Sequence, residues 1–381
     1  MEYRELGHTG LNVSAIALGC EGFMDKSIDI VKSEINFAAD SGVNFIDIYS
    51  SNPDLRSSIG AALKGKNDFY IQGHICSVWE NGQYLRTRDK KKSEAAFEDL
   101  LKRLGRDALD IGMIHYVDDA DDYRTVFEGE ILPWAINLKH QGKIKHIGLS
   151  SHNPDVARLA VESGAIEVLM FSVNPCYDMY PPEENVETLM DASNYKAGMQ
   201  NIEPARAELY EYCAKNGIGI DVMKAYGGGT LLKANESPFG KSLTTTQCLE
   251  YALTRPGVAS VMVGCNGINE IKAALGWLSA SPADKDYADV LSNLGHFSWK
   301  GRCMYCGHCA PCSAGIDIAA ANKFYSLAGA DGTIPETVAQ HYMALKHHAS
   351  ECVACGNCES NCPFGVEIIK QMKLTAARFG L

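Results

Sequence analysis

Short apolar runs and longer amphipathic runs alternate along the first 280 residues of this chain of 381 residues. Eight of the short runs have the length and apolar character of buried strands. The stretches between them carry apolar residues at helical spacing, and Gly105 and Gly164 stand where helices end. The predicted strands cover residues 13–19, 43–47, 69–75, 109–115, 145–149, 166–171, 218–223 and 259–263.

Eight strand–helix units predict an α/β fold, a closed (β/α)8 TIM barrel over residues 1–280, better than an open doubly wound sheet. The chemistry of such a barrel lies at the C-terminal ends of its strands. One connection is unusually long: residues 175–202 follow the sixth strand with little periodicity, and we read them as an active-site lid, a docking loop or a plain insertion. The polar residues at the predicted strand ends are Asp47, His74, His115, Ser150, Ser151, Asn174 and Lys224.

The chain has 14 cysteines, and eight of them lie between Cys303 and Cys362. No signal peptide precedes them, and no apolar run is long enough to span a membrane. A cytoplasmic chain with clustered cysteines indicates metal or redox chemistry and excludes a secreted disulfide scaffold. The 47 acidic and 35 basic residues give a net charge of −12, which argues against nucleic acid as a partner.

The clustered cysteines form two runs typical of bacterial ferredoxins, in which the fourth cysteine commonly binds the other cluster. The pattern therefore predicts two [4Fe–4S] clusters in a small, mainly helical, ferredoxin-like domain over residues 281–381. Zinc is the alternative, although zinc sites normally use paired cysteine knuckles and often histidine. The first predicted ligand set is Cys303, Cys306, Cys309 and Cys362, and the second is Cys352, Cys355, Cys358 and Cys312.

Four stretches of the first 280 residues resemble the aldo-keto reductases, in particular the bacterial branch with a C-terminal ferredoxin-like domain. They read YRELGHTGLNVSAIALG, GVNFIDIY, GKIKHIGLSSHNP and GIGIDVMKAYGGGTLL. The resemblance implies a catalytic Asp, Tyr, Lys and His below an NADPH at the barrel mouth. Asp47 matches the aspartate and His115 matches the histidine.

The other two catalytic positions depart from the family pattern. Asn52 stands where the tyrosine is expected, and His74 stands where the lysine is expected. Asparagine cannot deliver a proton at neutral pH, whereas histidine titrates close to neutrality. We therefore take Asp47, His74, His115 and the nearby Tyr49 as the catalytic candidates.

The cofactor positions are also altered. The family's Ser-Asn pair is Ser150-Ser151 here, and its glutamine on the sixth strand is Met170. The last loop keeps Gly264 but lacks the cation that binds the 2′-phosphate, and Glu270 would repel that phosphate. Ser150, Ser151, Gly264 and Lys224, which adjoins the glycines of residues 227–229, are the cofactor-binding candidates. NAD(P) and a flavin both stay open.

Two hypotheses follow from this combination. In the first, an oxidoreductase acts on a small organic substrate at the barrel mouth and relays electrons through the clusters, to or from a redox partner such as a ferredoxin or flavoprotein. In the second, the barrel has lost catalysis and serves as an electron-transfer or docking subunit. The missing tyrosine and lysine favour the second hypothesis, and the Asp47–His115 pair favours the first.

Overall fold

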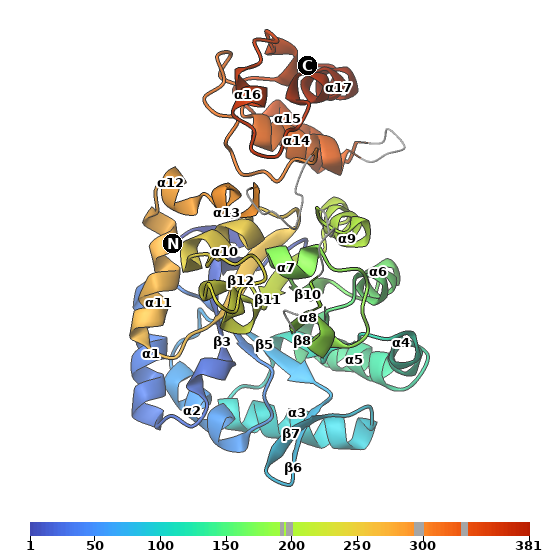
Figure 1. Cartoon of the computed structure of the whole chain (residues 1–381). Helices are drawn as coiled ribbons and strands as arrows, with labels where there is room; N and C mark the ends of the chain where they lie inside the picture. Colours follow the sequence, from blue (N-terminus) through green and yellow to red (C-terminus); the bar gives the residue numbers. More distant parts are fainter. Residues whose placement is uncertain (191–193, 196–200, 293–300, 329–333) are drawn as a thin grey trace.

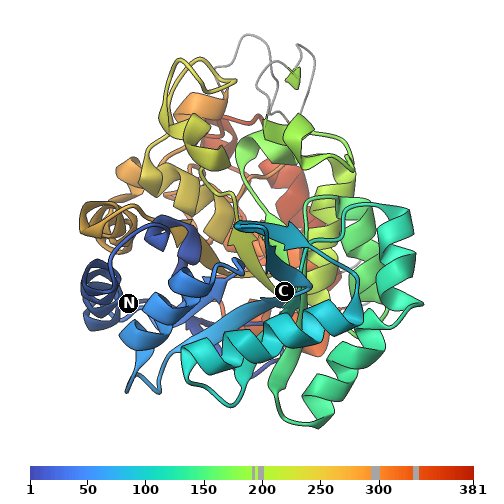
Figure 2. The same ribbon diagram turned by 90° about the horizontal axis from the view of Figure 1, so that it is seen from below.

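The structure is a computed structural model that describes residues 1–190, 194–195, 201–292, 301–328 and 334–381. Eight parallel strands close into a barrel, in which the last strand pairs with the first through Val263 and Leu18 (Figures 1 and 2). All eight predicted barrel strands are confirmed. They are β3 (Ile16–Gly19), β4 (Phe45–Ile48), β5 (Tyr70–Ile75), β8 (Leu109–Ile114), β9 (Ile144–Ser151), β10 (Val168–Ser172), β11 (Gly219–Met223) and β12 (Val258–Gly264).

Helices surround the barrel, and polar caps begin several of them. The side chains of Ser27, Asp89 and Thr244 each accept a backbone N–H at the start of the following helix. The helices predicted between the strands are confirmed, and two helices instead of one follow β8. The surrounding helices are α1 (Ile28–Asp40), α2 (Pro53–Leu63), α3 (Lys90–Leu104), α4 (Ala120–Phe127), α5 (Ile131–His140), α6 (Pro154–Glu162), α9 (Pro204–Lys215), α10 (Thr245–Leu253) and α11 (Ile268–Leu275).

Two antiparallel hairpins lie outside the barrel sheet, and neither was predicted. The strand expected over 13–19 is divided at Ala15, because residues 12–14 pair instead with the N-terminus. That hairpin, β1 (Tyr3–Glu5) and β2 (Asn12–Ser14), buries Leu6 and Val13 against the apolar residues inside the barrel. The second hairpin, β6 (Ser77–Glu80) and β7 (Gln83–Arg86), follows the C-terminal end of β5.

The long connection after β10 is described only in part. It contains α7 (Pro175–Asp178) and α8 (Val186–Met190), and residues 191–193 and 196–200 fall outside the described residues. Its role as lid or docking loop stays a prediction. The short 3₁₀ helix η3 (Gly227–Leu232) follows β11, and the short 3₁₀ helix η4 (Gly276–Ser279) follows α11.

Two short helices follow η4 in the described residues. These helices, α12 (Pro282–Lys285) and α13 (Ala288–Ser292), pack beside α10, since Gln247 Nε2 donates to Asp286 O at 2.5 Å. The predicted boundary at residue 280 stays a prediction. The C-terminal domain is mainly helical, with α14 (Ile318–Leu327), α15 (Glu336–Met343), η5 (Ala349–Glu351), α16 (Asn357–Ser360) and α17 (Ile368–Phe379).

The C-terminal domain and the β6–β7 hairpin lie at opposite ends of the molecule (Figures 1 and 2). The domain packs against the turns that precede β11 and β12, so it covers the N-terminal end of the barrel. The polar mouth is at the other end, and the apolar barrel interior separates the two. Within the described ranges, no helix has both the length and the apolar character that a membrane span requires.

Candidate active site

Three of the side chains predicted at the strand ends meet inside the barrel mouth. Asp47 lies on β4, His74 on β5 and His115 directly after β8, and all three are buried. His74 Nε2 is 3.1 Å from Asp47 Oδ1, and His74 Nδ1 is 2.6 Å from His115 Nδ1. Because β4, β5 and β8 are neighbours in the sheet, adjacent strands bring the three residues together.

The hydroxyl of Tyr84 joins this group from the β6–β7 hairpin. It hydrogen-bonds to His115 Nε2, and the two rings meet edge to face with centroids 5.3 Å apart. Tyr84 was not predicted, although the sequence carried a signal for its hairpin. Asn81 and Gly82 both have positive φ, at 54° and 76°, and Asn-Gly between alternating runs is typical of a two-residue hairpin turn.

The chemistry of each group orients the protons along this chain. The Asp47 carboxylate only accepts hydrogen bonds, so His74 Nε2–H donates to it. A neutral His74 then accepts at Nδ1 from His115 Nδ1–H. His115 Nε2 is left to accept from the Tyr84 hydroxyl. The arrangement is a continuous proton path from Tyr84 at the mouth to Asp47 in the barrel.

Burial controls the protonation of two groups around this path. Burial, and next the nearby His74, lowers the pKa of His115 well below its usual value, so His115 is neutral at pH 7. Asp221 on β11 is fully buried, and burial followed by the charge of Asp47 raises its pKa well above the usual value. Gln72 lies between the two carboxyl groups and donates to Asp47 at 3.0 Å. Asp221 is therefore an uncharged acid below a charged one.

Tyr49 and Asn52 lie at the edge of this chain. The hydroxyl of Tyr49 is 4.0 Å from Met24 Sδ, and the Tyr49 ring meets the rings of His74 and Tyr84 edge-on. Tyr49 therefore packs beside the proton path and is not hydrogen-bonded into it. Asn52 Oδ1 accepts from the N–H groups of Asp54 and Leu55, so the residue that replaces the family tyrosine caps α2.

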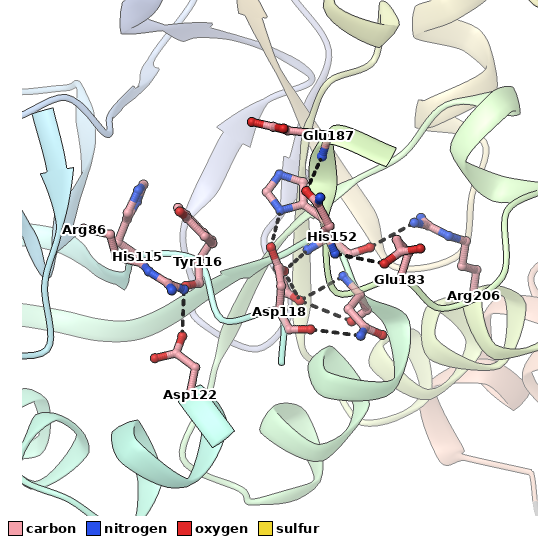
Figure 3. A network of polar contacts seen from close by, with 12 residues as sticks. Arg86, His115, Tyr116, Asp118, Asp122, His152, Glu183, Glu187 and Arg206 are labelled. Atoms are coloured by element: carbon pink, nitrogen blue, oxygen red, sulfur yellow. Dashed lines mark hydrogen bonds and ion pairs between the residues drawn. The ribbon is translucent and has the colours of Figure 1, made fainter. Parts of the chain in front are cut away.

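A second polar network lies across the mouth from His115 (Figure 3). Asp118 accepts from the His152 ring at 2.9 Å and from the Ser151 hydroxyl at 3.0 Å. Arg206 donates to His152 O at 2.9 Å. Tyr116 lies between the two networks, with its ring 4.9 Å from His115 and 6.0 Å from His152. The hydroxyl of Ser151 is thus already engaged within the protein.

The other predicted cofactor residues occupy different surroundings. Ser150 is buried on β9, and its Oγ has no hydrogen-bond partner among the described residues. Lys224 has a φ of 61°, and the glycines of residues 227–229 all have positive φ. The backbone conformation of this turn therefore explains the glycines without a bound ligand. Gly264 ends β12 and is exposed. The hydroxyl of Ser150 is therefore free to bind a ligand amide or hydroxyl.

A nicotinamide cofactor fits these residues only in part. The free hydroxyl of Ser150 suits a carboxamide, but Met170 offers no hydrogen bond. At the start of α11, the carboxylate of Glu270 accepts the N–H of Asn266. The cation nearest in sequence, Lys272, lies over the ring of Phe37 at 5.4 Å. The start of α11 therefore has the carboxylate of Glu270 at the position where the family binds a phosphate. We therefore derive no step through a nicotinamide.

The clustered cysteines surround two separate cavities in the C-terminal domain. Cys303, Cys306 and Cys309 line one cavity with Cys362, and Cys352, Cys355 and Cys358 line the other with Cys312. This is the crossed arrangement expected of the ferredoxin pattern. No group of three or more His, Cys, Asp or Glu among the described residues converges on a point that suits one metal ion. The thiols therefore fit a cluster better than a single zinc.

Hydrogen-bond donors also reach the cysteine sulfurs. Asn322 Nδ2 donates to Cys303 Sγ at 3.4 Å, and the Ser313 hydroxyl contacts Cys355 Sγ at 3.2 Å. We call the site of Cys303 the proximal site, because Met304 O accepts from the barrel residue Arg255 at 2.5 Å. The site of Cys355 is the distal site, where Cys355 and Val353 are exposed.

Comparison with known proteins agrees with this architecture. The model of the aldo/keto reductase family matches residues 16–246, and the model of the 4Fe–4S dicluster domain matches residues 302–367. The Bacillus subtilis protein named "Uncharacterized oxidoreductase YqkF" is 24% identical over 289 residues, which are 71% of this chain and 89% of that protein. The L-galactose dehydrogenase of Arabidopsis thaliana is 23% identical and aligns with 71% of this chain and 86% of its own length.

A solved structure shows the same barrel. The aldo-keto reductase AKR11C1 from Bacillus halodurans, in its holo form, superposes with a TM-score of 0.57 at 22% sequence identity. The superposition covers 75% of this chain and 94% of the other. Because the first family model covers more than half of the sequence, this chain belongs to the aldo/keto reductase family, as an oxidoreductase whose barrel is followed by a 4Fe–4S dicluster domain.

Proposed function

We propose that the protein interconverts the alcohol and carbonyl forms of a small organic substrate at the barrel mouth, and that electrons enter or leave through its iron–sulfur domain. The observation that carries this proposal is the unbroken path Tyr84–His115–His74–Asp47. Oxidation of an alcohol to a carbonyl removes the hydroxyl proton and, from the carbon, a hydrogen with two electrons. A two-electron acceptor at the mouth, such as a flavin, would take that hydrogen and its electrons and pass the electrons singly to the clusters. A path that begins at the mouth and ends on a buried carboxylate suits the transfer of the hydroxyl proton.

Tyr84 takes the position in this mechanism that Asn52 cannot fill. In the orientation derived above, a substrate hydroxyl next to Tyr84 passes its proton to the Tyr84 oxygen as the Tyr84 proton moves to His115. His115 passes its Nδ1 proton to His74, and the charge that develops on His74 is stabilised by Asp47. The reverse sequence protonates a carbonyl oxygen, so the same residues serve reduction.

The eight clustered cysteines would hold two [4Fe–4S] clusters, each of which passes single electrons. The exposed Cys355 and Val353 make the distal site the natural point of contact with a redox partner protein, such as a ferredoxin or a flavoprotein. Tyr287 and Arg255 hold the proximal site on the barrel. A partner bound at the distal site would therefore have the domain between itself and the barrel.

One observation favours the second candidate function, an electron-transfer or docking subunit with a non-catalytic barrel. The proximal site lies at the N-terminal end of the barrel, on the side away from the mouth. A strand of six residues such as β5 is about 20 Å long, at about 3.3 Å per residue. Electron transfer between the two ends would have to cross this packed core.

The test starts from the full chain purified without oxygen and assayed for iron and sulfide. Reduced methyl viologen is then supplied with a panel of small aldehydes and ketones, and oxidised viologen with small alcohols. Methylglyoxal and L-galactose belong in the panels because relatives carry the names methylglyoxal reductase and L-galactose dehydrogenase. Turnover supports the enzyme, whereas intact clusters without turnover of any compound favour the electron-transfer subunit.

The sharpest variant is Tyr84→Phe, which removes the hydroxyl and keeps the ring. We expect it to lower kcat by about 10²- to 10⁴-fold, the usual contribution of a general acid or base, with the iron content unchanged. Tyr49→Phe is the matched control, because the Tyr49 ring packs against Tyr84 while its hydroxyl is outside the proton path. Equal rates for the two variants would remove Tyr84 from the mechanism.

A further inference from the structure

Arg255 is a barrel residue that reaches into the proximal cysteine loop. It lies in the turn between α10 and β12, and its side chain is fully buried. Its Nη2 donates to Met304 O at 2.5 Å and to Tyr287 at 3.1 Å, and its Nε donates to Tyr251 O at 3.1 Å. The guanidinium also lies 5.4 Å from the ring centre of Tyr305. Met304 and Tyr305 stand between Cys303 and Cys306.

This buried guanidinium forms no ion pair with a carboxylate of the described residues. Within the described residues, no Asp or Glu oxygen lies within the 4.0 Å ion-pair distance of Arg255, and Arg255 Nη1 has no hydrogen-bond partner. The charge of one buried carboxylate, Asp178, does act on Arg255, but the hydrogen bonds of Asp178 are made with other residues. Asp178 accepts from the hydroxyls of Tyr210 at 2.5 Å and Tyr251 at 2.7 Å, and Arg206 lies 3.6 Å from it.

Arg206 provides an internal comparison, since it is also a fully buried arginine of the barrel. Its charge is matched by Asp178, and its Nη atoms donate to Ser172 O and His152 O. Arg255 donates to carbonyl and hydroxyl oxygens alone, which solvate a cation but do not neutralise it. A buried charge without an ion-pair partner is strongly unfavourable, so a negative charge closer to Arg255 than Asp178 would stabilise it.

The cysteines beside it supply that charge. When iron binds, Cys303, Cys306, Cys309 and Cys362 become thiolates, and a cluster with four thiolates carries net negative charge. Asn322 already directs an amide N–H at Cys303 Sγ, so the loop is arranged to stabilise negative sulfur. Arg255 donates to the backbone of this same loop and lies on its barrel side.

We propose that Arg255 is the counter-charge of the proximal [4Fe–4S] cluster and that it raises the reduction potential of this cluster relative to the distal one. Reduction adds one negative charge to a cluster, and a buried cation nearby stabilises the reduced form more than the oxidised form. The distal site contacts a neutral hydroxyl, that of Ser313, and its Cys355 is exposed. A higher proximal potential directs electrons from the exposed cluster toward the barrel.

The test is an EPR-monitored redox titration of the anaerobically purified full chain. Arg255→Met removes the charge and keeps the bulk, and we expect it to lower the potential of one of the two reduction steps while the other stays within error. Arg255→Lys keeps the charge, and its shift is expected to be smaller. Ser313→Ala removes the hydroxyl beside Cys355, and its shift identifies the distal step.

Arg302→Gln is the matched control, because Arg302 adjoins Cys303 but forms a half-exposed ion pair with Glu211 at 3.5 Å. Its effect on either potential is expected to be smaller than that of Arg255→Met and to vanish at high salt. The proposal is overturned if Arg255→Met leaves both potentials unchanged, or if Arg255→Lys shifts the proximal step as far as Arg255→Met does. If Arg255→Met fails to retain iron, retention by Arg255→Lys supports the counter-charge, and failure of both variants overturns it.

Discussion

The two ends of the barrel bury charged groups of opposite sign. At the mouth, the Asp47 carboxylate is surrounded by donors from His74 and Gln72, and a hydrogen-bonded path leads outward to Tyr84. At the N-terminal end, the buried charge is the cation Arg255, which meets a loop of cysteines. The mouth is therefore suited to moving protons, and the far end is suited to holding negatively charged clusters.

The apolar core between the ends explains how one barrel accommodates both. Leu6 and Val13 of the β1–β2 hairpin join Phe45, Ile111 and Val168 in a buried cluster inside the barrel. Loops at either end change without disturbing this core, so each end has its own chemistry. The contrast predicts that a substitution at one end should leave the other end's property intact.

The largest expected effect belongs to the cluster end and tests the crossed ligand sets. Cys362→Ala removes one predicted ligand of the proximal site, and we expect loss of about half of the iron, as expected when one of two clusters is lost. Cys309→Ala should abolish the same EPR signal, whereas Cys312→Ala should abolish the other one. If Cys362→Ala and Cys358→Ala lost the same signal instead, the ligand sets would not be crossed.

The next effect belongs to the mouth and concerns the buried acid Asp221. Its pKa is raised on folding, so folding keeps a proton that the unfolded chain releases above about pH 4. Its contribution to stability is therefore full below about pH 4 and falls by about 1.4 kcal/mol per pH unit as the pH rises toward the folded pKa. Asp221→Asn imitates the protonated acid without this cost, so we expect it to raise the free energy of unfolding at pH 7.

Urea unfolding of the wild type and of Asp221→Asn between pH 5 and pH 8 measures this effect. The gain should grow with pH, while the iron content and both reduction potentials stay unchanged. A gain that is the same at every pH would show that Asp221 is already ionised in the folded protein.

The smallest effect concerns the ion pair between Arg302 and Glu211, which joins the C-terminal domain to α9 at 3.5 Å. Both side chains are partly exposed, and such pairs contribute at most about 1 kcal/mol. Glu211→Gln should therefore lower the free energy of unfolding by less than about 1 kcal/mol, and the difference should disappear in high salt. A loss larger than about 1 kcal/mol would contradict the view that this ion pair contributes little to the stability of the interface.

The sequence predicted the repetitive parts of this molecule and missed the parts without a repeat. Each barrel strand is an apolar run with its own flanking turns, so the eight strands could be read one at a time. The β6–β7 hairpin has its turn at Asn81-Gly82 but is not predicted, because an inserted hairpin departs from the alternation of strands and helices. The strand expected over 13–19 was divided for a similar reason, since residues 12–14 pair with the N-terminus.

The residues of the candidate site also divide into those that the sequence predicts and those that it does not. Asp47, His74 and His115 could be predicted because strand ends of a barrel face one mouth, and the structure brings them into contact. Its short distance from Asp47 in the sequence makes Tyr49 a candidate to replace the missing catalytic tyrosine. The structure directs its hydroxyl toward Met24 instead, and Tyr84, 35 residues further along, reaches His115.

The sequence by itself determined the eight strands of the barrel, the two runs of cysteines and the polar residues of the mouth, because each depends on local spacing and residue type. The tertiary structure alone decided that Tyr84 contacts His115 and that the cysteine-lined cavities lie at the end of the barrel opposite the mouth. These features join segments far apart in the chain, and such contacts depend on packing that no local pattern records.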